Sequence, residues 1–281
     1  MTAMDRFKNF IPVLTCLLAY AEKVHMYYSA TTIDISDFLQ GDGDPWILTQ
    51  TDLENAVSNI NKTRKTVFFP AGVYYSSKPI ILDFAAVFPN TDENINLLRN
   101  GVRFIGENFA SVIQMGTFRN QTEPSFKIMY TEHGVFSYEF SGLTYIGDTD
   151  HTLLHMATTC NSCVMKLVDK NVFKGEDTEN SPRGNAIGLH ISRALQSDIS
   201  VVSTCAKGTA LYLRSCEFST FSGSFSNSLS DAASADGSSQ VTFNRYVSLN
   251  QHWHISKKVS LIYEPYELIL ITLSYTSLCI V

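Results

Sequence analysis

The residues best suited to chemistry in this sequence are polar side chains that recur at a fixed interval. Between residues 143 and 225, short segments of alternating apolar residues return every 22 positions, as at Leu167, Leu189 and Leu211. If one interval is one turn of a coil, residues one interval apart lie side by side, about 4.8 Å apart. Outward positions would then form a strip along the coil, and this strip would contain Lys170, His190, Tyr212 and Arg214.

Such a strip has the chemistry to bind a polysaccharide. The rings of Tyr212 and His190 can stack on sugar faces. The cations of Lys170 and Arg214 can pair with uronate or other acidic groups. A solvent-exposed sheet face must also be polar in any protein. A substrate-binding strip and an ordinary solvated surface are therefore the two interpretations of this pattern.

Cleavage of a glycosidic bond would require further groups at the strip. Hydrolysis uses two carboxyl groups, about 5–5.5 Å apart when configuration is retained and about 6.5–9.5 Å apart when it is inverted. Elimination uses a base, and a cation that neutralises the neighbouring carboxylate; Lys170, His190 and Arg214 are of the right type. The interval places Asp148 beside Lys170, without a carboxylate partner on the strip. The sequence does not choose between the two reactions, and the candidate catalytic acids are Asp148, Asp169, Glu176 and Asp177.

Short β-strands must carry these residues. Period-two alternation, as in Ile187-x-Leu189-x-Ile191, is typical of strands. A second strand follows in step, because Ile199 precedes Phe221 by the same interval. Several short strands in each repeat of this length predict an all-β solenoid, the parallel β-helix. A β-sandwich also alternates, but it has no reason to keep the interval constant.

The N-terminal part of the chain predicts a helix followed by strands. Thr51–Ile60 carries an apolar stripe that includes Leu53 and Val57, and Thr51 and Glu54 have the spacing of a capping box. A helix there would cover the open strand edges of the first coil. Residues 227–239 are predicted to form a long loop, and strands are expected at 32–36, 65–75 with a turn at 70–72, 76–82 and 101–106.

The order of these elements resembles the start of the pectate-lyase-like family. More narrowly, it is similar to the rhamnogalacturonase and epimerase-like branch, which includes bacteriophage tailspike depolymerases. The similarity covers residues 33–115, where Leu39 replaces a usual glycine and Asp44-Pro45-Trp46 replaces a pair of aspartates. The segments that carry it are Asp37-Phe38, Gly41-Asp42-Gly43, Thr66 to Tyr74, Pro79 to Leu82 and Gly101 to Gly106.

The resemblance implies a right-handed, single-stranded parallel β-helix with a short N-terminal capping helix. It also implies a polysaccharide partner, a glycosidase or polysaccharide lyase activity without a cofactor, and assembly as a homotrimer. The family's hydrolase motifs, Asn-Thr-Asp, an Asp-Asp pair and Gly-His-Gly, are absent, so no catalytic residue can be carried over. The alternative is a non-catalytic glycan-binding or structural β-helix, such as an adhesin or a tailspike fragment.

The sequence divides into a leader, a cap, a coil and a tail. Residues 1–21 have the basic, apolar and small-residue order of a signal peptide, which predicts a secreted or cell-surface protein; a short amphipathic N-terminal helix is the other interpretation. A phage virion tail is the alternative location. Residues 22–64 are predicted to be the cap and 65–256 the β-helix. Within the apolar tail 257–281, the uncharged run from Leu268 to Val281 is too short to span a membrane; it indicates a truncated coil or a last strand that covers the coil.

Charge and cysteine content limit the partners. With 281 residues and a net charge of −6, the chain lacks the basic balance that nucleic-acid phosphates require. Cys160-Asn-Ser-Cys163 is a CxxC motif near His155, but no second ligand pair has a matching spacing, so we expect no metal. Two small buried residues, or one disulfide in an exported protein, are the other interpretations of this motif.

Overall fold

The structure of the chain is a computed structural model. It describes residues 31–40, 45–89, 91–130, 137–173, 186–206, 208–227, 231–236, 238, 241–249, 252–256 and 278–279. The predicted signal peptide, the candidate acids Glu176 and Asp177, and all but two residues of the predicted tail lie outside these residues.

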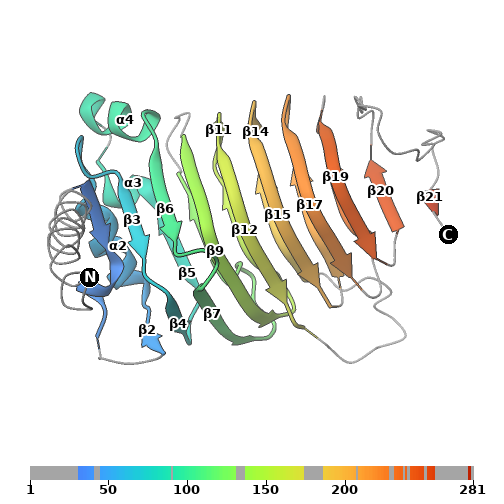
Figure 1. The fold of residues 1–281 in the computed structure, drawn as a ribbon, viewed down its shortest axis with the longest axis horizontal. Helices are drawn as coiled ribbons and strands as arrows, with labels where there is room; N and C mark the ends of the chain where they lie inside the picture. The colour runs from blue at the N-terminus through green and yellow to red at the C-terminus, as the bar shows by residue number, and fades with distance from the viewer. Residues whose placement is uncertain are drawn as a thin grey trace, which may run out of the picture.

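The described strands form two long sheets that follow the stack of coils (Figure 1) and a third sheet of two short strands. The first sheet has the order β1 (Thr32–Asp34), β3 (Thr66–Phe69), β6 (Val102–Gly106), β9 (Tyr138–Thr149), β12 (Val164–Asn171), β15 (Asp198–Cys205), β17 (Thr220–Asn227), β19 (Thr242–Leu249). Joined to it are β2 (Trp46–Ile47), β4 (Gly72–Ser76) and β7 (Ser111–Phe118).

The second and third sheets are built from the strands in between. The second has the order β5 (Ile80–Asp83), β8 (Phe126–Met129), β10 (Thr152–Ala157), β13 (Ala186–Ser192), β16 (Gly208–Arg214), β18 (Asp231–Asp236), β20 (His252–Ser256), β21 (Leu278–Cys279). The third consists of β11 (Cys160–Asn161) and β14 (Ala194–Leu195). Each strand pairs in parallel with its counterpart one coil on, except for the antiparallel pair β20 and β21, so the architecture is a parallel β-helix.

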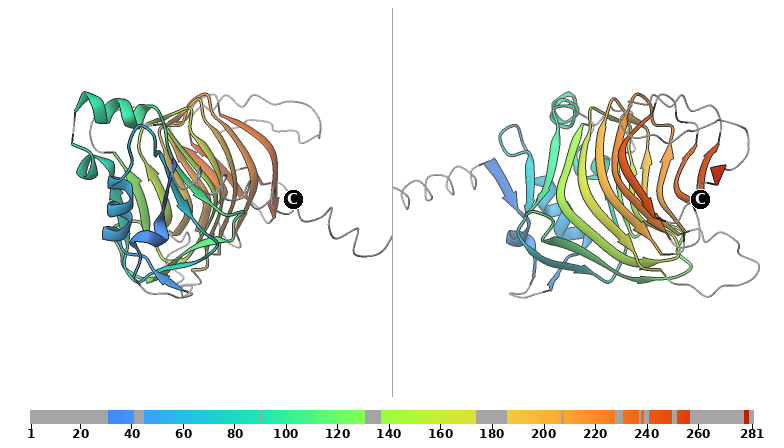
Figure 2. Two further views of the ribbon diagram at one scale, coloured as in Figure 1. Left: turned by 60° about the vertical axis from the view of Figure 1, so that its left-hand side comes forward. Right: turned by 45° about the vertical axis from the view of Figure 1, so that its right-hand side comes forward.

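The core lies between the sheets and follows from the alternation in the sequence. In β12, buried side chains alternate with partly or fully exposed ones, as the period of a strand requires; in β16 the alternation is interrupted once, where Ala210 and Leu211 are both buried. Equivalent side chains of successive coils therefore meet inside. Phe104 and Phe140 stack with ring centroids 4.7 Å apart, and Phe69 packs beside Phe104. Figure 2 shows the coils following one another around this interior.

Helices gather at the N-terminal end of the stack (Figure 1). The predicted helix is α2 (Gln50–Ser58), which buries Leu53 and Val57 as its apolar stripe requires. Its capping box is formed by Thr49 and Asp52, not by Thr51 and Glu54, because the helix begins at Gln50. The 3-10 helix η1 (Ile35–Phe38), α3 (Phe84–Val87) and α4 (Asp92–Arg99) complete the described helices.

The 22-residue interval holds only in the later coils. Leu189 pairs with Leu211 in the second sheet, as predicted. Leu167, by contrast, lies in the first sheet between Leu143 and Val201, so it does not stack with Leu189. The connection between β12 and β13 lengthens that coil and shifts the phase, although the alternation of apolar residues continues. The predicted loop 227–239 is also wrong in part, because it contains strand β18.

The corner that contains the CxxC motif is closed by polar ladders. Cys160 and Cys163 form a disulfide, and both residues are buried. In the next coils, the Ser197 hydroxyl accepts a hydrogen bond from the Cys163 N–H at 3.1 Å, and the Ser219 hydroxyl accepts one from the Ser197 N–H at 3.2 Å. These serines provide acceptors for backbone donors that are cut off from water.

Replacing Ser219 by alanine should therefore destabilise the coil. We expect the free energy of unfolding to fall by about 1–3 kcal/mol, because the buried Ser197 N–H loses its acceptor. Chemical denaturation of both proteins measures the difference. Ser222→Ala, on the partly exposed face of β17, is the matched control and should change stability by less than about 0.5 kcal/mol. Equal losses in the two variants would contradict a role for this ladder.

No helix among the described residues is both long and apolar enough to cross a membrane.

Candidate functional site

The second sheet places three rings in a row on its outer side. β10, β13 and β16 each carry a ring between two buried apolar residues, in Leu154-His155-Met156, Leu189-His190-Ile191 and Leu211-Tyr212-Leu213. The strand register pairs His155 with His190 and His190 with Tyr212, and it pairs Lys127 of β8 with His155. We call Lys127, His155, His190 and Tyr212 the histidine row.

The rings of the row contact one another directly. The imidazoles of His155 and His190 stack with centroids 3.9 Å apart and planes 5° apart. The Tyr212 ring meets His190 at 4.7 Å and 70°. The faces of His190 are therefore occupied by its neighbours, so the prediction that His190 stacks on a sugar face is wrong. What this histidine can offer a ligand is its ring edge, which carries the nitrogen atoms.

Both imidazoles are held neutral. Burial lowers the pKa of His155 to about 4, assisted by the charges of Lys127, His151 and Arg214. Burial likewise lowers the pKa of His190 to about 3, assisted by His155, Arg214 and His151. A neutral imidazole near pH 7 has one nitrogen with a free lone pair, which is what a base requires.

Ser192 connects the two histidines. Its hydroxyl oxygen lies 3.1 Å from Nε2 of His155 and 3.2 Å from Nε2 of His190. The hydroxyl has one proton, so it can donate to only one of the two nitrogens. When it donates to one Nε2, the oxygen can accept a hydrogen bond from the Nε2–H of the other ring. In that arrangement the two histidines are different tautomers.

Three of the four predicted binding residues are brought together. His190, Tyr212 and Arg214 lie on adjacent strands of the second sheet, and Arg214 is exposed and pairs in register with Ser192. Lys170 lies on β12 in the first sheet, beside Ile146 and Thr204, and is not part of the row. Its displacement has the same origin as the phase shift between the first and later coils.

The predicted acids do not form a pair among the described residues. Asp148 lies near the end of β9, where both carboxylate oxygens accept from Nη2 of Arg119, at 2.8 and 2.9 Å. The constant interval predicted that Asp148 lies beside Lys170, but its strand neighbour is Thr117. Asp169 points inward and is fully buried, so it does not reach the surface on which a polysaccharide would lie.

Asp169 is a carboxylic acid buried in the interior. The Ser203 hydroxyl lies 2.8 Å from Oδ1 of Asp169 and 2.6 Å from the Ala210 carbonyl oxygen. Burial raises the pKa of Asp169 well above its ordinary range, and the contact with Ser203 offsets this in part. The Ser203 hydroxyl is the donor in both contacts, so its one proton is shared between the carboxyl oxygen and the Ala210 carbonyl oxygen.

Sequence reasoning missed Lys127 and His155 as site residues, and it placed Ser192 on the outward strip without assigning it a role. His155 had been considered only for its nearness to the CxxC motif. The signal that could have found it is the repeated triplet of an apolar residue, a ring and an apolar residue, which does not depend on a constant interval. No group of three or more His, Cys, Asp or Glu suited to a metal ion occurs in the part of the chain that is described.

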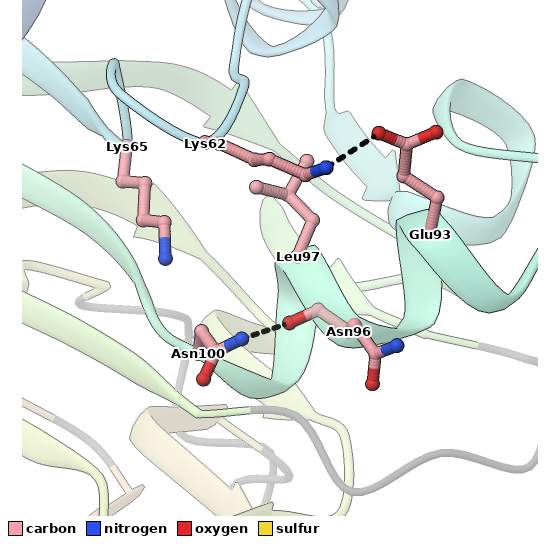
Figure 3. Close-up of a pocket in the computed structure, with 6 residues that line it drawn as sticks. All are labelled: Lys62, Lys65, Glu93, Asn96, Leu97 and Asn100. Atoms are coloured by element: carbon pink, nitrogen blue, oxygen red, sulfur yellow. Dashed lines mark hydrogen bonds and ion pairs between the residues drawn. The ribbon is translucent and has the colours of Figure 1, made fainter.

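A hollow of about 430 Å³ lies elsewhere, beside α4 (Figure 3). It contains no member of the histidine row. Nζ of Lys62 lies 3.1 Å from a carboxylate oxygen of Glu93, but the two side chains are 78% and 72% exposed. An ion pair this exposed contributes little to keeping the shape of the hollow fixed. The lining residues are Lys62, Lys65, Glu93, Asn96, Leu97 and Asn100. We therefore centre the candidate site on the histidine row.

Comparison with known proteins gives two distant structural likenesses. No family model and no curated protein matches the chain. ORF18 of Geobacillus virus E2 is 13% identical over 80% of this chain and 44% of its own, with a TM-score of 0.47, so the chain spans less than half of that protein. The A-module of the mannuronan C-5 epimerase AlgE4 of Azotobacter vinelandii is 11% identical over 76% of both chains, with a TM-score of 0.27.

Proposed function

We propose that this protein binds an acidic polysaccharide along the second sheet and cleaves it by elimination at the histidine row. The observation that carries the proposal is the pair of neutral, stacked imidazoles with Arg214 and Lys127 near them. Successive rungs about 4.8 Å apart give a long chain of sugars repeated contacts along one direction.

Elimination needs a base and a cation. The histidine row supplies the base, and Arg214, which lies beside the row, supplies the cation. A neutral imidazole removes the proton from the carbon next to a uronate carboxylate. The guanidinium of Arg214 pairs with that carboxylate and stabilises the negative charge that develops on it. The C–O bond to the neighbouring sugar then breaks as a carbon–carbon double bond forms, and the Tyr212 hydroxyl can protonate the departing oxygen. Lys127 is a weaker candidate for the cation, because Glu123 lies 3.0 Å from its Nζ.

Elimination is preferred to hydrolysis because of where the acids lie. A glycosidase needs two carboxyl groups across one bond. Asp148 is held by Arg119 and Asp169 is buried. Glu176 and Asp177 are not described, so a role for them stays a prediction from the sequence.

Incubation of the protein with a panel of uronate-containing polysaccharides tests the proposal. We expect new chain ends with an unsaturated uronate, detected by their ultraviolet absorbance. New reducing ends without this absorbance would indicate hydrolysis instead. Retention on an immobilised glycan without any product would favour the second candidate, a non-catalytic glycan-binding β-helix, which the separation of the ion-paired Asp148 from the buried Asp169 also favours.

The proposal includes the finer features implied by the family resemblance. These are a right-handed coil, closed at its N-terminal end by α2, of the rhamnogalacturonase and epimerase-like branch. Support for the cap comes from α2, which packs against η1, β5 and α3 at the first coils. A homotrimer, and export or a place on a phage tail, complete the proposed setting. Light scattering measures the mass of the assembly and tests the homotrimer. Mass spectrometry of the N-terminal peptide of the mature protein tests export.

A further inference from the structure

The contacts of Ser192 have a chemistry that elimination does not use. This serine ends β13, two residues after His190, on the same outer side of the second sheet. Its oxygen is within hydrogen-bond distance of both imidazoles, and its strand partner on the next coil is Arg214. A hydroxyl beside a neutral imidazole that other groups hold in place is the arrangement of an activated nucleophile.

We propose that Ser192 is the nucleophile of an acyl-transfer site that hydrolyses ester-linked acyl groups. The substrate class is an O-acylated sugar, and this choice of alcohol rests on the proposed polysaccharide ligand. The reaction itself needs only an accessible ester and water, so a small synthetic ester can report it.

The two tautomers give the two histidines different tasks. The imidazole that accepts the Ser192 proton acts as the base. The other imidazole donates its Nε2–H to the same oxygen, so it stabilises the alkoxide as the proton leaves. The stacking of the two imidazoles, and the T-shaped contact of His190 with Tyr212, keep both rings in the orientation that these contacts need.

The reaction has two balanced halves. In the first, the Ser192 oxygen bonds to the ester carbon, its proton passes to the imidazole, and the negative charge on the carbonyl oxygen is stabilised by Arg214. The bond from carbon to the sugar oxygen then breaks, and the imidazole returns the proton to that oxygen. In the second half, water attacks the acyl-serine and gives its proton to the imidazole. The acid leaves, and Ser192 regains its hydrogen.

Labelling with a fluorophosphonate, followed by peptide mapping, tests the assignment directly. We expect the adduct on the peptide that contains Ser192, and a burst of 4-nitrophenol from 4-nitrophenyl acetate. Ser192→Ala should lose both signals. The double variant His155→Gln, His190→Gln should be labelled at least about 100-fold more slowly than the wild type, because no imidazole is left to take the proton.

Ser200→Ala is the matched control. Ser200 is also a partly exposed strand serine, but it lies on β15 in the first sheet and pairs with Lys166 and Ser222. It should label like the wild type. Absence of an adduct in folded wild-type protein, or an adduct that persists in Ser192→Ala, would overturn the assignment. Unsaturated products without a Ser192 adduct would remove this inference alone, whereas an adduct without unsaturated products would remove only the proposed elimination.

Discussion

Replacing Asp169 by asparagine is expected to stabilise the protein at neutral pH. The folded protein keeps the proton on this buried acid, whereas the unfolded chain releases it above a pKa of about 3.9. Folding must then take up a proton from solution. Between the unfolded and the folded pKa, this costs up to about 1.4 kcal/mol for each pH unit.

The direction of this pH dependence follows from the protons bound. Above the unfolded pKa the folded state holds one more proton than the unfolded state, so stability falls as pH rises until the folded pKa is reached. Asparagine is neutral at every pH and has a similar shape. Its amide oxygen can accept the hydrogen bond that the Ser203 hydroxyl donates to Oδ1 of Asp169. The variant should therefore lack this falling slope, and its advantage over the wild type should grow as the pH rises from the unfolded pKa toward the raised folded pKa.

Denaturation curves for both proteins at several pH values measure the effect. Asp148→Asn is the control, because Asp148 is a partly exposed carboxylate paired with Arg119. It should not remove the slope. A wild-type slope that persists in Asp169→Asn would show that another group causes it.

The surroundings of Asp169 leave no room for a larger side chain. A Cβ on Gly188 would lie 2.6 Å from Oδ1 of Asp169 and 2.8 Å from the Ser203 oxygen.

The fold could be predicted from the sequence because its main signal is local. Alternation of buried and exposed residues decides the strands, and the later coils keep one length, so Leu189 and Leu211 were paired correctly. The sequence could not show that the earlier coils differ in length. Loop length costs little free energy, so a coil can grow at a corner without disturbing the strands that it joins.

The site was predicted in part for the same reason. His190, Tyr212 and Arg214 lie in coils of constant length, so counting by 22 placed them correctly. Lys170 and His155 lie before the long connection, so the same count assigned Lys170 to the row and left His155 out. The sequence also could not show that Asp169 is buried. An acid at an inward position cannot be told from one at a surface position until the strand register is known.

His190→Gln is the variant with the largest expected effect on cleavage. Glutamine can still donate an amide hydrogen to Ser192, but it cannot accept a proton from a sugar carbon. We expect the rate of unsaturated-product formation to fall by about 100- to 10,000-fold, the usual contribution of a positioned base. Initial rates with saturating polysaccharide, together with binding to the same polysaccharide, separate loss of catalysis from loss of affinity.

Lys170→Gln distinguishes the two possible sites. It removes the charge that the constant interval assigned to the row, but Lys170 lies in the first sheet, so the wild-type rate should be kept. A normal rate in His190→Gln with a large loss in Lys170→Gln would instead place the base on the first sheet.

The pH dependence of cleavage by the wild type follows from the two imidazoles. A base must be neutral, and the pKa values of His155 and His190 are lowered to about 4 and about 3. The kcat/KM of cleavage should therefore stay constant below neutral pH and fall as the pH drops toward 4.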